Sequence, residues 1–227
     1  MLIDTILPQP EKKNLTVKEC QDWWDNFVSH EYFTEYAWCL SQPQLYAKIP
    51  LTKDSSILEI GNGYGRQLSQ FLKITDKVYG VDISKSSIEL ARKHCPEAIL
   101  TDFDGSNLPF LREQFDLVTS VFVMQHTSKE NVKQLLNESF RVLNKDGYFL
   151  HEFLGGNWIA NKGNEHYSMR KINEDGTFDG MYNNGYTVKE IKEICQELGL
   201  NIHWIEEIKM MEDGTTNIWL CVKKDGQ

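Results

Sequence analysis

Three glycines, Gly61, Gly63 and Gly65, stand at alternate positions directly after an apolar run at 56–60. The apolar run predicts a buried strand, and residues 67–73 predict a helix. Glycine lets a turn adopt positive φ and lets a ligand approach bare backbone. The free N–H groups at the start of the helix lie beside that turn. A strand, a glycine-rich turn and a helix in this order indicate a site for a nucleotide-type cofactor.

The spacing of the glycines separates two kinds of cofactor. A dinucleotide fingerprint, G-x-G-x-x-G, would need glycine at position 66, where the chain has Arg66. The pattern Glu59-x-Gly61-x-Gly63-x-Gly65 instead resembles motif I of the class I S-adenosylmethionine (SAM)-dependent methyltransferases. This resemblance implies that the glycines pack against the amino-acid and ribose portions of SAM, with Glu59 near its methionine end. The alternative is a glycine-rich turn that binds nothing.

An acidic residue ends the second predicted strand, at 77–82, and lies one helix after the glycines. A carboxylate at this place can accept both ribose hydroxyls of an adenosine. The resemblance gives Asp82 this role toward SAM. The alternative is a helix N-cap, because Ser84 and Ser86 open the next helix and aspartate caps helices well.

The third predicted strand, at 98–100, leads into a second acidic stretch. The resemblance implies that Asp102 accepts from the adenine amino group and that the N–H of Phe103 faces the ring. Asp102 is preferred to Asp104, although both fit turn residues beside Gly105. The resemblance thus implies these cofactor-binding residues: Glu59, Gly61, Asn62, Gly63, Gly65, Asp82, Ile83, Asp102, Phe103 and Val121.

The elements that would position these residues alternate between strand and helix from Ser55 onward, which is typical of a parallel sheet. The predicted fold is α/β: a Rossmann-like, seven-stranded, mostly parallel sheet with helices on both faces, an antiparallel C-terminal hairpin and an N-terminal helical lid. The resemblance covers about 55–224. Further predicted strands lie at 114–122, 148–153, 201–210 and 216–223. Asp116 enters the fourth strand at its start, away from the ligand end, so we interpret it as structural.

The chemistry that the resemblance implies is methyl transfer. The sulfonium of SAM makes its methyl group electrophilic without a metal, and S-adenosylhomocysteine (SAH) is the product. An oxygen or nitrogen nucleophile must also lose a proton, so a base near neutral pKa helps. The candidate catalytic residues are His126 first, then His151 or Glu152. His126 fits a structural loop histidine equally well. His151 and Glu152 point to opposite faces of one strand, so we expect one of them at most in the site.

Two regions outside the alternating pattern are candidates for binding the acceptor. We expect residues 1–50 to form a helical lid segment and residues 51–227 the SAM-binding domain, together one domain. Within the latter, 155–186 forms an insertion that shapes the acceptor pocket, the alternative being a surface loop. The candidate substrate-binding residues are Tyr32, Tyr36, Trp158, Tyr167 and Arg170. The aromatic residues near the N-terminus fit a plain hydrophobic core as an alternative.

Composition limits the partners. The 227-residue chain has a net charge of −9, which argues against a broad nucleic-acid surface. No apolar run approaches the roughly 20 residues of a membrane helix, and no leader pattern is visible. Five scattered cysteines without C-x-x-C indicate reduced thiols in the cytoplasm and no metal site.

These observations favour a SAM-dependent methyltransferase acting on an O or N atom of a small polar metabolite, such as a sugar, a phosphorylated intermediate or a building block of a surface polysaccharide. An RNA- or protein-modifying methyltransferase and a non-catalytic SAM-binding module are the alternatives. A dehydrogenase is disfavoured by the glycine spacing.

Overall fold

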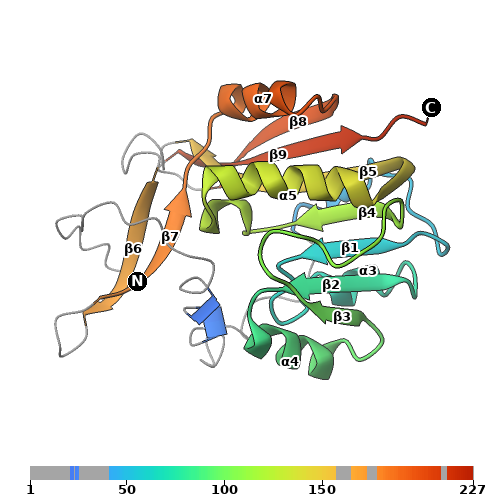
Figure 1. Cartoon of the computed structure of the whole chain (residues 1–227), viewed down its shortest axis with the longest axis horizontal. Coiled ribbons are helices and arrows are strands. Elements are labelled where there is room, and N and C mark those ends of the chain that lie inside the picture. Colours follow the sequence, from blue (N-terminus) through green and yellow to red (C-terminus); the bar gives the residue numbers. More distant parts are fainter. Residues whose placement is uncertain are drawn as a thin grey trace.

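The computed structural model describes residues 21–22, 24–25, 41–156, 165–172, 178–210 and 214–226, with the side chains of 165–172 and 178–182 left out. Its centre is a seven-stranded sheet with the strand order β3-β2-β1-β4-β5-β9-β8. The five strands β3, β2, β1, β4 and β5 run parallel. Strand β9 is antiparallel to β5, and β8 is antiparallel to β9. Figure 1 shows the strands side by side in this order.

The strands of the large sheet are β1 (Ile57–Ile60), β2 (Val78–Asp82), β3 (Ile99–Asp102), β4 (Phe115–Ser120), β5 (Leu143–Gly156), β8 (Ile202–Lys209) and β9 (Thr215–Lys223). The helices are α2 (Pro43–Tyr46), α3 (Leu68–Phe71), α4 (Lys85–His94), η2 (Met124–His126), α5 (Lys129–Val142) and α7 (Val188–Glu197). A separate two-stranded antiparallel sheet consists of β6 (Glu165–Ile172) and β7 (Phe178–Asn184).

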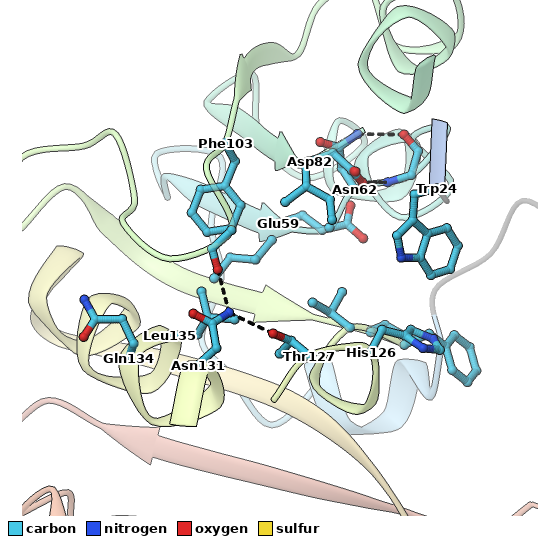
Figure 2. A pocket seen from close by; sticks show the side chains of 18 of the residues that line it. Trp24, Glu59, Asn62, Asp82, Phe103, His126, Thr127, Asn131, Gln134 and Leu135 are labelled. Atoms are coloured by element: carbon cyan, nitrogen blue, oxygen red, sulfur yellow. Dashed lines mark hydrogen bonds between the residues drawn. The ribbon is translucent and has the colours of Figure 1, made fainter. Parts of the chain in front are cut away.

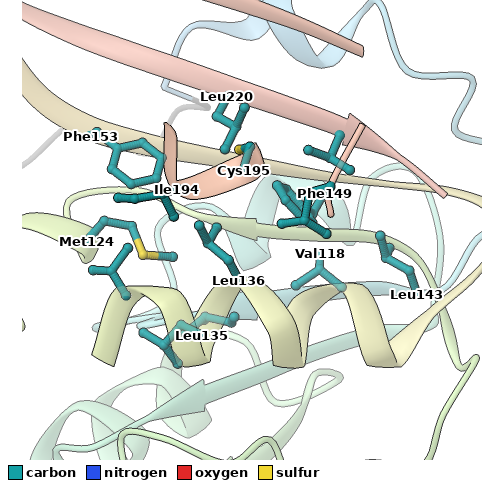
Figure 3. Packing of buried hydrophobic residues seen from close by; sticks show 14 of the residues in the cluster. Val118, Met124, Leu135, Leu136, Leu143, Phe149, Phe153, Ile194, Cys195 and Leu220 are labelled. Carbon is teal, nitrogen blue, oxygen red and sulfur yellow. The ribbon is translucent and has the colours of Figure 1, made fainter. Parts of the chain in front are cut away.

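Two hydrophobic layers hold the sheet. One cluster joins inward side chains of α5 and α7, such as Leu136 and Ile194, to Phe149 of β5. Figure 3 shows α5 lying along this layer with Leu135 and Leu136 on it. The other cluster joins α2 and α3 to the opposite face of the sheet. Because both faces are covered, β1 is buried at every position, as expected of a central parallel strand.

Side-chain caps define where the helices begin. Ser84 caps α4 by accepting from the N–H of Ser87, and Ser128 caps α5 by accepting from the N–H of Asn131. At α7, Thr187 and Glu190 form a reciprocal capping box. The sequence thus supplies each of these three helix starts with its own cap.

The predicted fold class is confirmed, including the seven-stranded sheet and its antiparallel C-terminal hairpin. The structural interpretation of Asp116 is also confirmed, because its carboxylate accepts from the backbone N–H of Ser56 and from the Asn144 amide. The segment 155–186, expected to be an insertion or a surface loop, contains β6 and β7. Figure 1 places this hairpin beyond the end of the sheet where β1, β2 and β4 finish.

The helical segment expected at 1–50 lies largely outside the described residues. Residues 21–22 and 24–25 are helical. Leu45, Tyr46 and Ile49 are buried against the sheet. The end of this segment therefore contributes to the hydrophobic core. No helix in the described part of the chain is long and apolar enough to span a bilayer.

His151 ties the sheet to α5 instead of facing a cavity. Its Nδ1 lies 2.8 Å from Ser120 Oγ and its Nε2 lies 3.0 Å from Ser139 Oγ, and the imidazole is fully buried. Ser139 Oγ donates to the carbonyl oxygen of Leu135, so it accepts from Nε2–H, and Nδ1 accepts from Ser120. The side chain is neutral and fully hydrogen-bonded.

Burial lowers the pKa of His151 to about 3, below its ordinary value near 6.5. As pH falls, the unfolded chain therefore binds a proton before the folded protein does. We expect the unfolding free energy to drop between about pH 6.5 and 3, by up to about 1.4 kcal/mol per pH unit from this group. Denaturant titrations at pH 7 and pH 5 measure this slope.

His151→Asn should reduce the slope because it removes the titrating ring. His203→Asn is the matched control, since His203 is exposed on β8. Equal slopes in the wild type and His151→Asn would contradict the assignment of a neutral, buried imidazole.

Candidate functional site

A cavity of about 710 Å³ opens at the carboxyl ends of β1, β2 and β4. In open α/β sheets this is where ligands bind. Figure 2 shows Asp82, Asn62 and Glu59 along one side of the cavity, with Trp24 and His126 toward one end and Phe103 and Leu135 toward the other. The cavity therefore has one polar side, an end with a tryptophan and a histidine, and an opposite end with apolar side chains.

The glycine turn forms one wall of the cavity. Gly61 has φ +69°, and a Cβ built on it would lie 2.3 Å from Val123 Cγ2, which is too close for any real contact. Gly61 and Val123 both line the cavity. A side chain at position 61 would therefore strain the backbone and displace the opposite wall.

Asp82 fixes the glycine turn from the end of β2. Its Oδ2 accepts from the N–H of Gly63 at 2.9 Å, and its Oδ1 accepts from the N–H of Ser84 at 2.8 Å. Burial raises the pKa of the carboxyl to about 6, against the lowering effect of these two hydrogen bonds. Each oxygen keeps a second lone pair, so the carboxylate can still accept from a ligand.

Glu59 lies on the cavity wall at the end of β1 with one oxygen lacking a hydrogen-bond partner among the described residues. Its Oε1 accepts from the Gln67 amide, whereas its buried Oε2 has no such partner. Burial raises the pKa of Glu59 to about 8, opposed by the Gln67 hydrogen bond and the positive charge of Arg66. An unpaired, buried acceptor facing a cavity is suited to a ligand that donates hydrogen bonds or carries positive charge.

The end of the cavity near Phe103 is held by Asn131 of α5. Its amide donates to the carbonyl oxygen of Gly105 at 2.7 Å and to Thr127 Oγ1 at 2.9 Å, as Figure 2 shows. Its oxygen accepts from Ser106 Oγ at 2.9 Å. Asn131 therefore fixes the loop after β3 against the start of α5.

The other end of the cavity joins segments far apart in the sequence. The rings of Trp24 and His126 meet edge to face with centroids 5.1 Å apart. The adjacent Asp25 carboxylate accepts from Ser84 Oγ at 2.7 Å and from the N–H of Ser86 at 3.2 Å, at the start of α4. The short helical piece 24–25 is thereby anchored on both sides of the cavity.

The hairpin after β5 supports the same end. The side-chain amide of Asn184, the last residue of β7, donates to the carbonyl oxygen of Thr127 at 2.6 Å. Tyr186 donates from its hydroxyl to the carbonyl oxygen of Met124 at 3.4 Å. The turn that carries His126 is thus braced from the 155–186 region.

Of the three candidate catalytic residues, the structure brings His126 alone to the cavity wall. His151 is buried on the α5 side of the sheet, as described above. Glu152 lies on the opposite face, 1% exposed and below the wall, where its Oε2 accepts from the N–H of Phe122 at 2.7 Å. Burial raises the pKa of Glu152 to about 8. The two side chains do face opposite ways, but neither lines the cavity.

Among the ten predicted cofactor residues, the cavity wall includes Glu59, Gly61, Asn62, Gly63, Asp82, Ile83, Phe103 and Val121. Two lie elsewhere. Gly65 packs against Cys95 and Ala91 below the turn, and Asp102 is exposed at the end of β3. The N–H of Phe103 donates to the carbonyl oxygen of Asp82, so the Phe103 side chain and not its amide is offered to the cavity.

The predicted acceptor residues cannot be placed from the described part of the chain. Tyr32, Tyr36 and Trp158 lie outside the described residues. Tyr167 and Arg170 lie on β6, whose side chains are not described. Their roles stay predictions.

Several residues of the cavity wall were not predicted from the sequence. They include Trp24, Tyr64, Arg66, Gln67, Asn131 and Gln134. Asn131 and Gln134 are three apart on the polar side of α5, and this spacing is a visible signal. Trp24 carried no comparable signal, because helical spacing of aromatic residues indicates packing and not a ligand site.

Comparison with known proteins agrees with this geometry. A family model described as a methyltransferase domain matches residues 58–151. An uncharacterized methyltransferase of Oceanobacillus iheyensis is 27% identical over 104 residues, covering 46% of this chain and 49% of that protein. The chain thus spans about half the length of this curated relative.

Solved structures match over more of the chain. A SAM-dependent methyltransferase from Methanosarcina mazei superimposes with a TM-score of 0.69 at 19% identity, covering 83% of this chain and 100% of that one. The 1,6-didemethyltoxoflavin-N1-methyltransferase of Burkholderia thailandensis, solved with bound 1,6-didemethyltoxoflavin and SAH, gives a TM-score of 0.69 at 16% identity, covering 96% of this chain and 94% of that one. The fold is that of the class I SAM-dependent methyltransferases, and residues 58–151 match the model of a methyltransferase domain.

Proposed function

We propose that the chain is a SAM-dependent methyltransferase acting on an O or N atom of a small polar molecule. One observation carries the proposal: the cavity is walled by a glycine turn that tolerates no side chain at Gly61, with the carboxyls of Asp82 and Glu59 beside it. The match of residues 58–151 to a methyltransferase domain supports the reaction class.

The residues present fit SAM. Asp82 would accept from the ribose hydroxyls, because each of its oxygens keeps a lone pair. Glu59 Oε2, which has no hydrogen-bond partner among the described residues, would accept from the cationic ammonium of the methionine part. Phe103 and Leu135 offer apolar surface for the adenine ring. Among the described residues no group of three or more His, Cys, Asp or Glu side chains has an arrangement that could hold a metal ion.

When bound, SAM supplies an electrophilic methyl group on a sulfonium. The chain's own contribution is to hold the acceptor in line with that methyl and to accept the acceptor's proton. Alignment alone can supply a large part of the rate. His126 is the titratable side chain on the wall at the end away from Phe103, and a base near neutral pKa suits proton removal.

The acceptor class rests on the shape and charge of the site. The cavity of about 710 Å³ is lined by α5, the glycine turn and the helical piece 24–25, and this volume suits a small molecule. The net charge of −9 argues in the same direction against nucleic acid. No helix of the described residues spans a membrane, and we propose a cytoplasmic enzyme on the basis of cysteine usage.

Calorimetry tests the cofactor part of the proposal directly. We expect SAM and SAH to bind the purified chain with one site each, and NADH not to bind. Binding of NADH in the absence of SAM binding would overturn the assignment. A screen of small polar acceptors for SAH release then identifies the acceptor.

His126→Ala should slow turnover by about 10²- to 10⁴-fold if His126 is the general base, since that is the usual contribution of such a group. The affinity for SAH should stay within about twofold, a change that corresponds to roughly 0.4 kcal/mol. The measurements are the turnover rate and SAH calorimetry of the same preparation. His203→Ala, at an exposed site on β8, is the matched control. An unchanged rate would exclude His126 as the base.

A further inference from the structure

The backbone at Phe122 is strained where β4 passes into the cavity wall. Phe122 has φ +58°, and it is the one aromatic residue with a positive φ among those the structure describes. The other non-glycine examples, Gln42, Glu113 and Asp146, are polar. A bulky residue in this region is an outlier that costs stability.

Burial of the Phe122 ring is incomplete. It is 41% exposed although it lines the cavity, whereas its neighbours Val121 and Met124 are buried. Glycine or asparagine would meet the backbone requirement with less strain. Complete packing in the core is therefore not the reason for a phenyl ring at this position, and the ring stands where a ligand in the cavity could contact it.

A buried acid holds the strained turn in place. Glu152 Oε2 accepts from the N–H of Phe122 at 2.7 Å, and the Asn217 amide donates to Glu152 Oε1. Glu152 is 1% exposed, and burying a carboxyl group is costly. A strained aromatic residue and a buried acid thus meet at one backbone amide, and the visible product of both is a ring presented to the cavity.

Two further rings line the cavity beside this turn. Phe122 immediately precedes the segment that carries His126, and His126 is in edge contact with Trp24. Figure 2 places Trp24 and His126 at the end of the cavity opposite Phe103. The adenosine-binding groups proposed above, Asp82 and Phe103, leave this aromatic end for the acceptor.

We propose that Phe122 is a specificity-determining residue that selects an acceptor built on a planar, unsaturated ring, and that Glu152 is the positioning residue that fixes it. The proposal rests on the proposed function and narrows its acceptor class. Aromatic faces prefer stacked or edge-on contacts with other aromatic rings, which a saturated ring of the same size cannot make. The nucleophilic O or N atom would be a substituent or a member of that planar ring.

Neutral ligand pairs that differ in planarity test the proposal: 2-naphthol with 2-decalol, and benzamide with cyclohexanecarboxamide. Their dissociation constants are measured by ligand-observed NMR on the wild-type chain, with and without saturating SAH. We expect the planar member to bind roughly fivefold tighter, the size of one aromatic contact. Equal binding, or binding of neither member, would overturn the proposal.

Phe122→Leu keeps a similar apolar volume but removes the planar phenyl ring. The preference for the planar ligand of each pair should therefore vanish, while SAH affinity should stay within about twofold. A preference that persists in Phe122→Leu would assign selection to another residue. If the wild-type chain selects planar ligands but binds neither SAM nor SAH, the proposed function is refuted, whereas the selection of planar ligands by Phe122 is not.

Glu152→Ala and Glu152→Gln test the positioning role. Glutamine keeps an oxygen that accepts from the N–H of Phe122, so Glu152→Gln should retain the planar preference, whereas Glu152→Ala should lose most of it. Phe122→Gly supplies the structural readout: its unfolding midpoint should match or exceed that of the wild type because glycine relieves the strain. A large loss of stability in Phe122→Gly would mean that the ring is kept for packing.

Discussion

Gly61→Ala is expected to reduce SAH affinity by about 10- to 100-fold, equivalent to roughly 1.4 to 2.7 kcal/mol. A left-handed backbone at φ +69° is unfavourable for alanine, and its methyl carbon would lie 2.3 Å from Val123 Cγ2. Val123 is β-branched and stiff about χ1, so the clash must move the wall or the turn. Calorimetry with SAH measures the loss.

Gly199→Ala is a closely matched control. Gly199 has φ +66°, nearly the same as Gly61, but an added Cβ would meet nothing within 4 Å. It follows the end of α7 and does not itself line the cavity, although Glu197 and Leu198 before it do. We expect Gly199→Ala to lose about 1–2 kcal/mol of unfolding free energy from backbone strain alone and to keep SAH affinity.

The difference between the two variants isolates the close approach of Gly61 to Val123. Equal SAH affinities in Gly61→Ala and Gly199→Ala would show that the cofactor does not depend on the turn at Gly61. Denaturant titration of both variants must accompany the calorimetry, so that a loss of folded protein is not mistaken for a loss of binding.

The sheet and the glycine-turn wall of the cavity could be predicted from the sequence because their signals are local. Strand and helix periods alternate within 55–150, and Gly61 and Asp82 lie at the ends of adjacent strands that the alternation itself places together. Thr187 and Glu190 likewise specify a helix start within four residues. Each of these inferences used only residues that are close to one another in the sequence.

Contacts between distant segments could not be predicted. Trp24 and His126 meet across the cavity, and no period in the sequence connects them. Strand alternation placed His151 and Glu152 on opposite faces, but it does not say which layer or cavity each face meets. The sequence did not predict strand β6 for another reason. Glu165–Ile172 is mostly polar and pairs with β7 in a separate two-stranded sheet outside the core.

The positive φ of Phe122 could not be predicted from residue propensities. Nothing in the run Val121-Phe122-Val123 predicts a left-handed residue, since β-branched and aromatic residues favour extended strands. The strain comes from tertiary contacts, in particular the carboxyl of Glu152 on the N–H of Phe122. Local rules are expected to fail at positions that tertiary contacts strain in this way.

Asp82→Ala is expected to weaken SAH binding by at least about tenfold, because hydrogen bonds to a charged acceptor contribute roughly 1.5–3 kcal/mol. Two losses combine. The ribose hydroxyls lose their acceptor, and the N–H groups of Gly63 and Ser84 lose the oxygens that hold the glycine turn. Asp54→Ala, at an exposed acid in the loop before β1, controls for the change in net charge.

The pH dependence of binding distinguishes a direct contact from a merely structural role for Asp82. Burial raises the pKa of this carboxyl to about 6, so in the free protein it is ionised above that pH and protonated below it. Hydroxyl donors bind the ionised form better, and SAH affinity should therefore fall as pH drops from 7 to 5, by up to about tenfold per pH unit below 6. Asp82→Asn does not titrate and should show a shallower dependence over the same range. If the wild type and Asp82→Asn lose affinity in parallel, the proton that matters belongs to another group, and the ribose assignment of Asp82 fails.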